Sequence, residues 1–311
     1  MNSKVLTSVN KPDPSDSLPP WRKLQPEVKS TRLAVLGYPV HHSRSPEMHN
    51  AALREMERSD AKYKDWKYFR SELPPAELRE AISAFHTAQI RGLNLTIPHK
   101  TDILPFIRVS PSVQRMGAAN TLLWTPDGYV GYNSDGIGLE RALKRDFDLD
   151  LKGLTVLMLG AGGAARATTL HLLEKEVRQI FIVNRSRDRA ETIIDLARQA
   201  GWDERVAYLS PSSKEFPKID VVINATSLGL KPADPAPIDL SRLPGKPSVY
   251  DMIYNPPETS LLKQAMHLGC PHSNGLSMLA YQGIESLRIW TEDSIKIPEG
   301  AFLLALGLAE S

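Results

Sequence analysis

The chain has 311 residues, a length that accommodates about two domains of ordinary size. Hydrophobic residues make up 41% of it and charged residues 24%, which is the balance of a globular protein. The formal net charge is +2, with acids and bases intermixed, so nothing favours nucleic acid or an anionic membrane as a partner. No apolar run reaches the ~20 residues that a membrane span needs.

A single cysteine, Cys270, excludes an intramolecular disulfide and fits a protein of the reducing cytoplasm. We expect Cys270 to be structural, in a turn that follows a helix. Residues 1–30 are rich in Pro, Ser and Asp and lack an apolar signal core. We therefore expect them to form a disordered or loosely attached tail.

Strands and helices alternate in the region that follows. We predict strands over residues 31–37, 67–73 and 92–98, and a helix over residues 75–87. Another helix begins at Ser45, which has the character of an N-cap, with Pro46 as its first residue. Met48, Ala52 and Met56 share one face of this helix. The alternation predicts an α/β protein with a mostly parallel sheet.

A second region begins near Leu151. We predict strands over residues 154–159, 179–184, 205–209, 220–225 and 247–253, with helices over 165–175 and 189–200. Regular β-α-β alternation with a glycine-rich first turn is typical of a Rossmann domain. Two more helices, over 277–290 and 298–310, close the chain. We expect residues 31–136 and the returning helices 277–311 to form a substrate-binding catalytic domain, and residues 137–276 to form the Rossmann domain.

A glycine-rich turn lies between the first strand and helix of the second region. It reads Gly160-Ala161-Gly162-Gly163-Ala164-Ala165, which fits the pattern G-x-G-x-x-A. In this pattern the first glycine allows the tight turn, the second lets a pyrophosphate approach the backbone, and the small last residue permits close packing of helix on strand. Free N–H groups at the helix start then hold the phosphates. The turn predicts a dinucleotide site.

The end of the next strand indicates which dinucleotide binds. Enzymes that use NAD carry an acidic residue there for the ribose hydroxyls, whereas this chain reads Asn184-Arg185-Ser186-Arg187-Asp188-Arg189. Arg185 and Arg189 can pair with a 2′-phosphate, and Asn184 and Ser186 can hydrogen-bond to it. We therefore predict NADP as the cofactor.

Three polar segments in the first region carry more polarity than packing requires: residues 42–46, 94–100 and 131–136. In an extended strand Asn94 and Thr96 point to the same face, and Lys100 lies just past the strand end. Ligands of α/β proteins bind at such strand ends. His41, His42 and His99 lack the partner spacing of a metal site, so we expect no metal.

These segments, with residues 117–121, resemble the signature stretches of shikimate dehydrogenases. The resemblance continues in family order through residues 224–229, 250–259 and 274–283, and it covers about residues 33–285. One departure is Gly283, where many members of the family carry alanine. The resemblance implies an NADP-linked oxidoreductase of aromatic amino acid biosynthesis that interconverts 3-dehydroshikimate and shikimate.

The resemblance also implies roles for individual residues. The catalytic pair is Lys100 with Asp135, and two serines, Ser43 and Ser45, bind the substrate carboxylate. Further substrate contacts fall to Thr96, Asn120, Tyr254 and Gln282, with Asn94 as a neighbouring candidate. The 2′-phosphate clamp matches Asn184, Arg185, Ser186 and Arg189, while Met252 and Gly275 lie near the nicotinamide.

Other functions stay open at this point. A quinate or dual quinate/shikimate dehydrogenase of the same family is the nearest alternative. A non-catalytic sensor of metabolite or nucleotide would be marked by loss of Lys100 or Asp135, and both are present. A relative that acts on an aminated substrate is a further alternative. The sequence does not distinguish a monomer from a homodimer.

Overall fold

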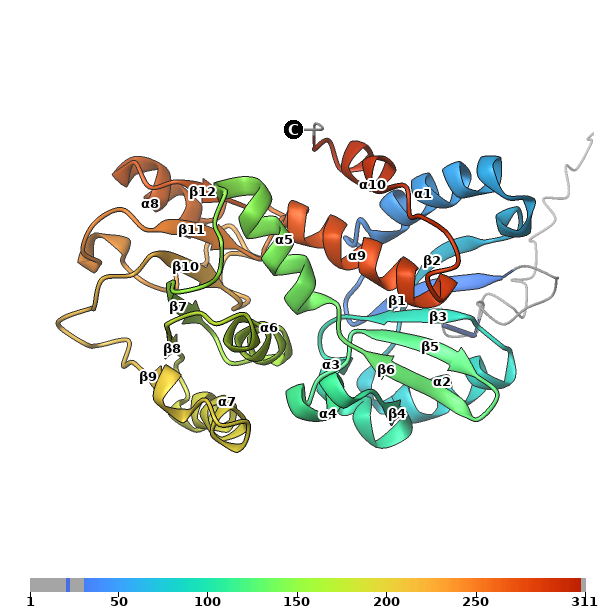
Figure 1. Cartoon of the computed structure of the whole chain (residues 1–311), viewed down its shortest axis with the longest axis horizontal. Coiled ribbons are helices and arrows are strands. Elements are labelled where there is room, and N and C mark those ends of the chain that lie inside the picture. The colour runs from blue at the N-terminus through green and yellow to red at the C-terminus, as the bar shows by residue number, and fades with distance from the viewer. Residues whose placement is uncertain (1–20, 23–30, 309–311) are drawn as a thin grey trace, which may run out of the picture.

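The computed structural model describes residues 21–22 and 31–308, which form two sheets connected by helices. Figure 1 shows the first sheet at one end of the molecule and the second sheet at the other, with α5 and α9 crossing between them. The order of strands in the first sheet is β2-β1-β3-β5-β6-β4, and in the second it is β12-β11-β10-β7-β8-β9.

The elements of the first half include every strand and helix predicted from the sequence, with three further strands and two further α-helices. The strands are β1 (Arg32–Gly37), β2 (Lys67–Glu72), β3 (Gly92–Leu95), β4 (Arg108–Val109), β5 (Thr121–Thr125) and β6 (Gly128–Tyr132). The α-helices are α1 (Ser45–Ser59), α2 (Leu78–Thr87), α3 (His99–Asp102) and α4 (Pro111–Met116). The sequence did not lead us to expect the hairpin β5–β6, which pairs antiparallel with β3 in an otherwise parallel sheet.

The second half is an all-parallel sheet with the strand order of a Rossmann domain. Its strands are β7 (Thr155–Leu159), β8 (Gln179–Val183), β9 (Val206–Tyr208), β10 (Val221–Asn224), β11 (Ser248–Asp251) and β12 (His272–Ser273). Its helices are α6 (Gly163–Glu174), α7 (Arg187–Gln199) and α8 (Ser260–Leu268). Each of β7, β10 and β11 is almost entirely buried, as expected of central strands covered on both faces.

Three helices connect the halves. Helix α5 (Asp135–Phe147) leads from β6 to the second sheet, and α9 (Leu276–Thr291) packs along it. Helix α9 then reaches β5, and α10 (Glu299–Ala305) packs on α1, so the C-terminal helices return to the first half as predicted. Five short 3₁₀ turns complete the described structure: Ala61–Tyr63, Pro75–Glu77, Leu104–Phe106, Asp203–Arg205 and Leu240–Arg242.

The start of α1 differs from the prediction in one respect. The N-cap is Arg44, and Ser45 is the first helical residue, so the prediction of Ser45 as N-cap is wrong. The physical reason is that the helical hydrogen bonds begin one residue earlier: the Arg44 carbonyl accepts from the Met48 N–H at 3.3 Å, and no side chain caps the helix. The apolar face is as predicted, with Met48, Ala52 and Met56 buried.

Part of the segment expected to be a loose tail is packed on the first half. Trp21 is 1% exposed, and its ring meets Phe85 of α2 edge-on with centroids 5.9 Å apart. The indole N–H donates to Glu77, and Arg22 pairs with Glu80. For Trp21 and Arg22 the expectation of a tail is therefore wrong; the rest of residues 1–30 lies outside the described structure.

Candidate active site

Lys100 and Asp135 meet where β3 and β6 end. Lys100 lies in α3 just after β3, and Asp135 begins α5 just after β6. The Lys100 Nζ donates to the Asp135 Oδ2 at 2.6 Å, and the two side chains are only 15% and 4% exposed. This pair is therefore unlike an exposed surface ion pair, because little water screens the two charges.

The carboxylate of Asp135 is held by Asn120. Asn120, immediately before β5, donates from Nδ2 to the Asp135 Oδ1 at 2.8 Å and to Gln282 Oε1 of α9 at 3.3 Å. Its own Oδ1 accepts from the Ser134 N–H at 2.8 Å. Both oxygens of Asp135 thus have a partner, and Asn120, Asp135 and Gln282 form one network around Lys100.

The glycine turn of the second half lies against this network. A Cβ added at Gly163 would come within 3.2 Å of the Lys100 Cβ. Lys100 belongs to the first half of the chain and Gly163 begins α6 in the second. The contact therefore brings the cationic side chain to the place where the sequence predicts a dinucleotide.

The glycine turn itself fits a phosphate group. Gly160 has φ +106°, a conformation that suits glycine, and a Cβ there would lie 3.0 Å from the carbonyl oxygen of Ala225. Gly162 is the N-cap of α6 with no side-chain cap, and a Cβ at Gly162 would meet nothing within 4 Å. No side chain caps the first N–H groups of α6, and there is room beside Gly162, so this end of the helix suits an anion. Buried Ala165 packs α6 on the sheet; the remaining turn residues are Ala161 and Ala164.

The residues proposed for the 2′-phosphate follow β8. Asn184 donates from Nδ2 to the Ser186 carbonyl at 2.7 Å, which shapes the turn into α7. Arg185 and Arg189 are exposed, and neither has an ion-pair partner among the residues that the structure describes. Arg187, by contrast, pairs with Glu191 at 3.0 Å and lies over the ring of Tyr208. Arg185 and Arg189 are the arginines left available for an anion.

Met252 and Gly275 are neighbours at the ends of the second sheet. A Cβ at Gly275 would be 2.1 Å from the carbonyl oxygen of Met252, so only glycine fits there. The Met252 N–H donates to the Asn224 carbonyl at 2.9 Å, which places it near the residues that pack on Gly160. The candidate nicotinamide contacts thus lie on the same edge of the sheet as the glycine turn.

Ser43, Ser45 and Tyr254 come together from both halves. The Tyr254 phenol, after β11, lies beside the Ser43 side chain, and burial raises the pKa of Tyr254. Ser45 is buried next to Ser43. Thr96 follows β3, where its methyl group packs under Gly37. The predicted strand ends at Leu95 rather than Pro98, because the His99 N–H donates to the Thr96 carbonyl and closes a turn.

The structure also brings in residues that sequence reasoning missed. Tyr68 of β2 donates its hydroxyl to Asn94 Oδ1 at 2.7 Å, and the Asn94 Nδ2 donates to Ser286 of α9 at 2.9 Å. His49 stacks on Tyr68 with ring centroids 4.0 Å apart, and burial lowers the pKa of His49 to about 4. No local signal marks Tyr68 or Ser286, since a tyrosine in a strand and a serine in a helix are ordinary.

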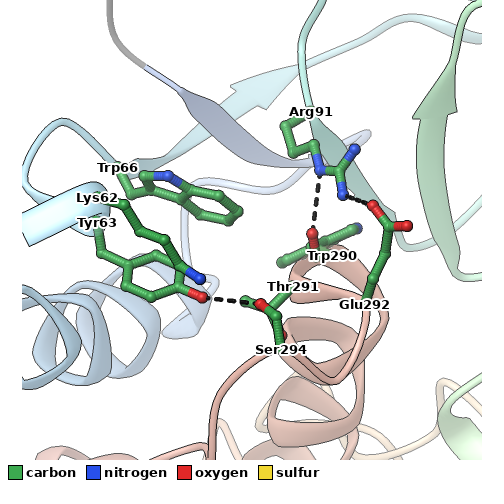
Figure 2. A pocket seen from close by; sticks show the side chains of 8 residues that line it. All are labelled: Lys62, Tyr63, Trp66, Arg91, Trp290, Thr291, Glu292 and Ser294. Carbon is green, nitrogen blue, oxygen red and sulfur yellow. Dashed lines mark hydrogen bonds and ion pairs between the residues drawn. The ribbon is translucent and has the colours of Figure 1, made fainter. Parts of the chain in front are cut away.

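A hollow of about 370 Å³ lies away from all of these residues. Figure 2 shows its lining at the end of α9, where Arg91 donates to the Trp290 carbonyl and pairs with Glu292. None of the expected site residues lines it. Among residues 21–22 and 31–308 there is no cluster of three metal-ligating side chains, and no helix is long and apolar enough to cross a membrane.

A parallel sheet with a glycine turn, facing a lysine–carboxylate pair on a second α/β unit, is typical of dinucleotide-dependent oxidoreductases. Comparison with known proteins agrees. Residues 35–122 match the family model described as shikimate dehydrogenase substrate binding domain, and residues 141–230 match that described as shikimate / quinate 5-dehydrogenase. The chain belongs to the shikimate dehydrogenase family.

Individual relatives resemble the chain over most of its length. The "Shikimate dehydrogenase (NADP(+))" of Geobacter metallireducens is 38% identical over 268 residues, which are 85% of this chain and 92% of that protein. A crystal structure of a shikimate dehydrogenase in complex with NADP+ has a TM-score of 0.80 at 31% identity and covers 92% of this chain and 99% of the other. The shikimate 5-dehydrogenase of Thermus thermophilus, solved with NADP(H) and shikimate, has a TM-score of 0.74 at 33% identity, with 89% and 98% covered.

Proposed function

We propose that this protein is a shikimate dehydrogenase that reduces 3-dehydroshikimate to shikimate reversibly with NADPH. The observation that carries the proposal is the Lys100–Asp135 pair, nearly excluded from water and in contact with the glycine turn. The names of the relatives support the substrate and the cofactor. The presence of both Lys100 and Asp135 argues against a non-catalytic sensor.

The chain's own groups suit the reduction of a ketone. NADPH supplies the hydride when it is bound. As negative charge develops on the carbonyl oxygen, the Lys100 ammonium stabilises it and delivers a proton. Asp135 keeps the ammonium oriented, and Asn120 fixes Asp135 through the bond of 2.8 Å. In the opposite direction the same pair accepts the proton of the hydroxyl.

The substrate is anchored away from the reacting carbon. The hydroxyls of Ser43 and Ser45 are 3.2 Å apart and are neutral donors for a carboxylate. A distant anchor determines which ring carbon meets the nicotinamide. Quinate has an additional ring hydroxyl that needs space or a partner near this anchor, where Tyr254 already contacts Ser43. This crowding favours shikimate. Asn94, Thr96, Asn120, Tyr254 and Gln282 as substrate contacts belong to the proposal.

The cellular setting is part of the same proposal. We place the reaction in aromatic amino acid biosynthesis in the cytoplasm. We assign residues 31–136 with 277–311 to the substrate domain and 137–276 to the NADP domain.

A direct assay tests the function. Purified protein is given shikimate or quinate with NADP+ or NAD+, and cofactor reduction is followed by absorbance. We expect the highest kcat/KM for the combination of shikimate and NADP+. Higher kcat/KM with quinate would replace the substrate assignment, and no reduction with any pair by protein that binds NADP+ would contradict the function.

A further inference from the structure

Tyr68 connects three parts of the candidate substrate site, and neither the motifs nor the chemistry above assigns it a role. It lies in β2, an edge strand of the first sheet, and is 2% exposed. Burial raises the pKa of Tyr68 well above its ordinary value, so its hydroxyl stays neutral and can donate. The hydroxyl donates to the Asn94 Oδ1, and the Ser45 side chain lies beside it.

The direction of these bonds follows from the atoms involved. The Asn94 Oδ1 can only accept, so the phenolic proton points to Asn94 across 2.7 Å. The Ser45 hydroxyl, beside the Tyr68 oxygen, accepts from the Ser43 hydroxyl at 3.2 Å. The phenol therefore lies between the hydroxyls of the carboxylate anchor and the amide of Asn94.

Asn94 connects Tyr68 to the catalytic network through hydrogen bonds. Its Nδ2 donates to the Asn120 carbonyl at 3.1 Å and to the Ser286 hydroxyl at 2.9 Å. Asn120 in turn holds Asp135. At 5% exposure and with both ends of its amide bonded, Asn94 has little freedom to move. Hydrogen bonds thus join Tyr68 to Asp135 through Asn94 and Asn120, and the anchor serines lie beside the Tyr68 hydroxyl at the other end of this run.

Tyr68 is itself held firmly by α1. The side chain of Asn50 bonds both to the Tyr68 N–H at 2.9 Å and to the Tyr68 carbonyl at 2.8 Å, along the free edge of β2. His49 stacks on the phenol ring with an interplanar angle of 10°. Ser45 begins the same helix. The contacts of Asn50 and His49 therefore hold Tyr68 in a fixed position relative to the N-terminal end of α1, where the carboxylate anchor lies.

We propose that Tyr68 is a positioning residue for the substrate: it sets the distance between the carboxylate anchor and the Lys100–Asp135 pair. This inference rests on the proposed function. Tyr68 is assigned no contact with the reacting atoms, and its effect is exerted through Ser45 and Asn94.

The test compares two tyrosines. Tyr68→Phe removes the hydroxyl that serves the site. Tyr129→Phe is the matched control, because Tyr129 is also 2% exposed and also gives up one hydrogen bond of 2.7 Å, to the Ile90 carbonyl in a separate hydrophobic cluster. Both variants are measured for kcat and KM with shikimate and NADP+, and for thermal unfolding.

We expect kcat/KM for shikimate to fall about tenfold in Tyr68→Phe, as for the loss of one buried hydrogen bond. The KM for shikimate rises while the KM for NADP+ stays within about twofold. Tyr129→Phe loses similar thermal stability but keeps its kcat/KM. An unchanged kcat/KM in Tyr68→Phe, or an equal fall in both variants, would overturn the inference. Failure of the unmodified protein to turn over shikimate would instead overturn the proposed function.

A double-mutant cycle tests whether Tyr68 acts through Asn94. If it does, Tyr68→Phe combined with Asn94→Ala lowers kcat/KM no further than Asn94→Ala alone, because the two changes remove the same connection. Strictly multiplicative losses in the double variant would contradict the proposed route.

Discussion

At the scale of single residues, we propose that the two exposed arginines after β8 make the protein bind NADP rather than NAD. Arg185 and Arg189 have no ion-pair partner in the described part of the chain, whereas Arg187 is occupied by Glu191 and Tyr208. A guanidinium without a partner at the end of the second Rossmann strand suits the 2′-phosphate that distinguishes NADP from NAD.

We predict that Arg185→Ala raises the Kd for NADPH roughly 10-fold or more, because a charge-assisted hydrogen bond contributes about 1.5–3 kcal/mol. The Kd for NADH should change less than about twofold, since NADH lacks the phosphate. Fluorescence titration with both cofactors measures this, and Arg187→Ala serves as the control. Equal losses for NADPH and NADH would count against the clamp.

The sequence motifs identified some residues of the candidate site and missed others. Lys100, Asp135, Asn120 and Gln282 lie in motifs that the family resemblance covers, and the structure brings these four together. Tyr68 gave no such signal, because its role depends on two partners distant in sequence, of which Asn94 is 26 positions away. Local pattern does not carry that information.

At the scale of elements, the crossing of α5 and α9 positions side chains of the candidate active site. A Cβ at Gly138 of α5 would lie 2.8 Å from the Gln282 Cβ and 3.1 Å from the Met278 carbonyl oxygen of α9. The absence of a side chain lets the two helices approach closely. Asp135 begins α5 and Gln282 belongs to α9, so this contact holds both sides of the network around Asn120.

We predict that Gly138→Ala destabilises the protein by about 1–3 kcal/mol through overpacking and lowers kcat. In an exposed helix the same change would stabilise the protein by up to ~1 kcal/mol. The sign of the change in unfolding free energy therefore shows whether Gly138 lies in a tight contact between helices. Urea unfolding and the shikimate assay measure it, with Lys144→Ala on the exposed side of α5 as the control. A variant as stable as the unmodified protein would show that the helices are not in tight contact.

Some elements were predictable and others were not. Strands β7 to β11 and helices α6 and α7 followed from apolar runs and the glycine turn, because each forms from local sequence, whereas the short edge strand β12 was missed. Helix α5 was missed, since Gly136 and Gly138 in its first turns weaken the helical signal. The hairpin β5–β6 was missed as well, and its insertion beside β3 depends on pairing between distant segments.

At the scale of the whole molecule, the chemistry needs both halves. The first half supplies Lys100, and the second supplies the glycine turn that meets it at Gly163. The sequence predicted the two halves and the return of the C-terminal helices, because motif order and helix periodicity are local properties. It did not predict how closely the halves approach, since side-chain packing of α5 against α6 and α9 sets that distance.

In the proposed reaction, Lys100 performs the proton transfer. The most direct measurement is kcat of Lys100→Ala with shikimate and NADP+, together with the Kd for NADPH from fluorescence titration. We predict that kcat falls about 10²–10⁴-fold, the usual contribution of a general acid–base, while the Kd changes less than about threefold. A kcat within about tenfold of the unmodified protein, with NADPH bound normally, would contradict this role of Lys100.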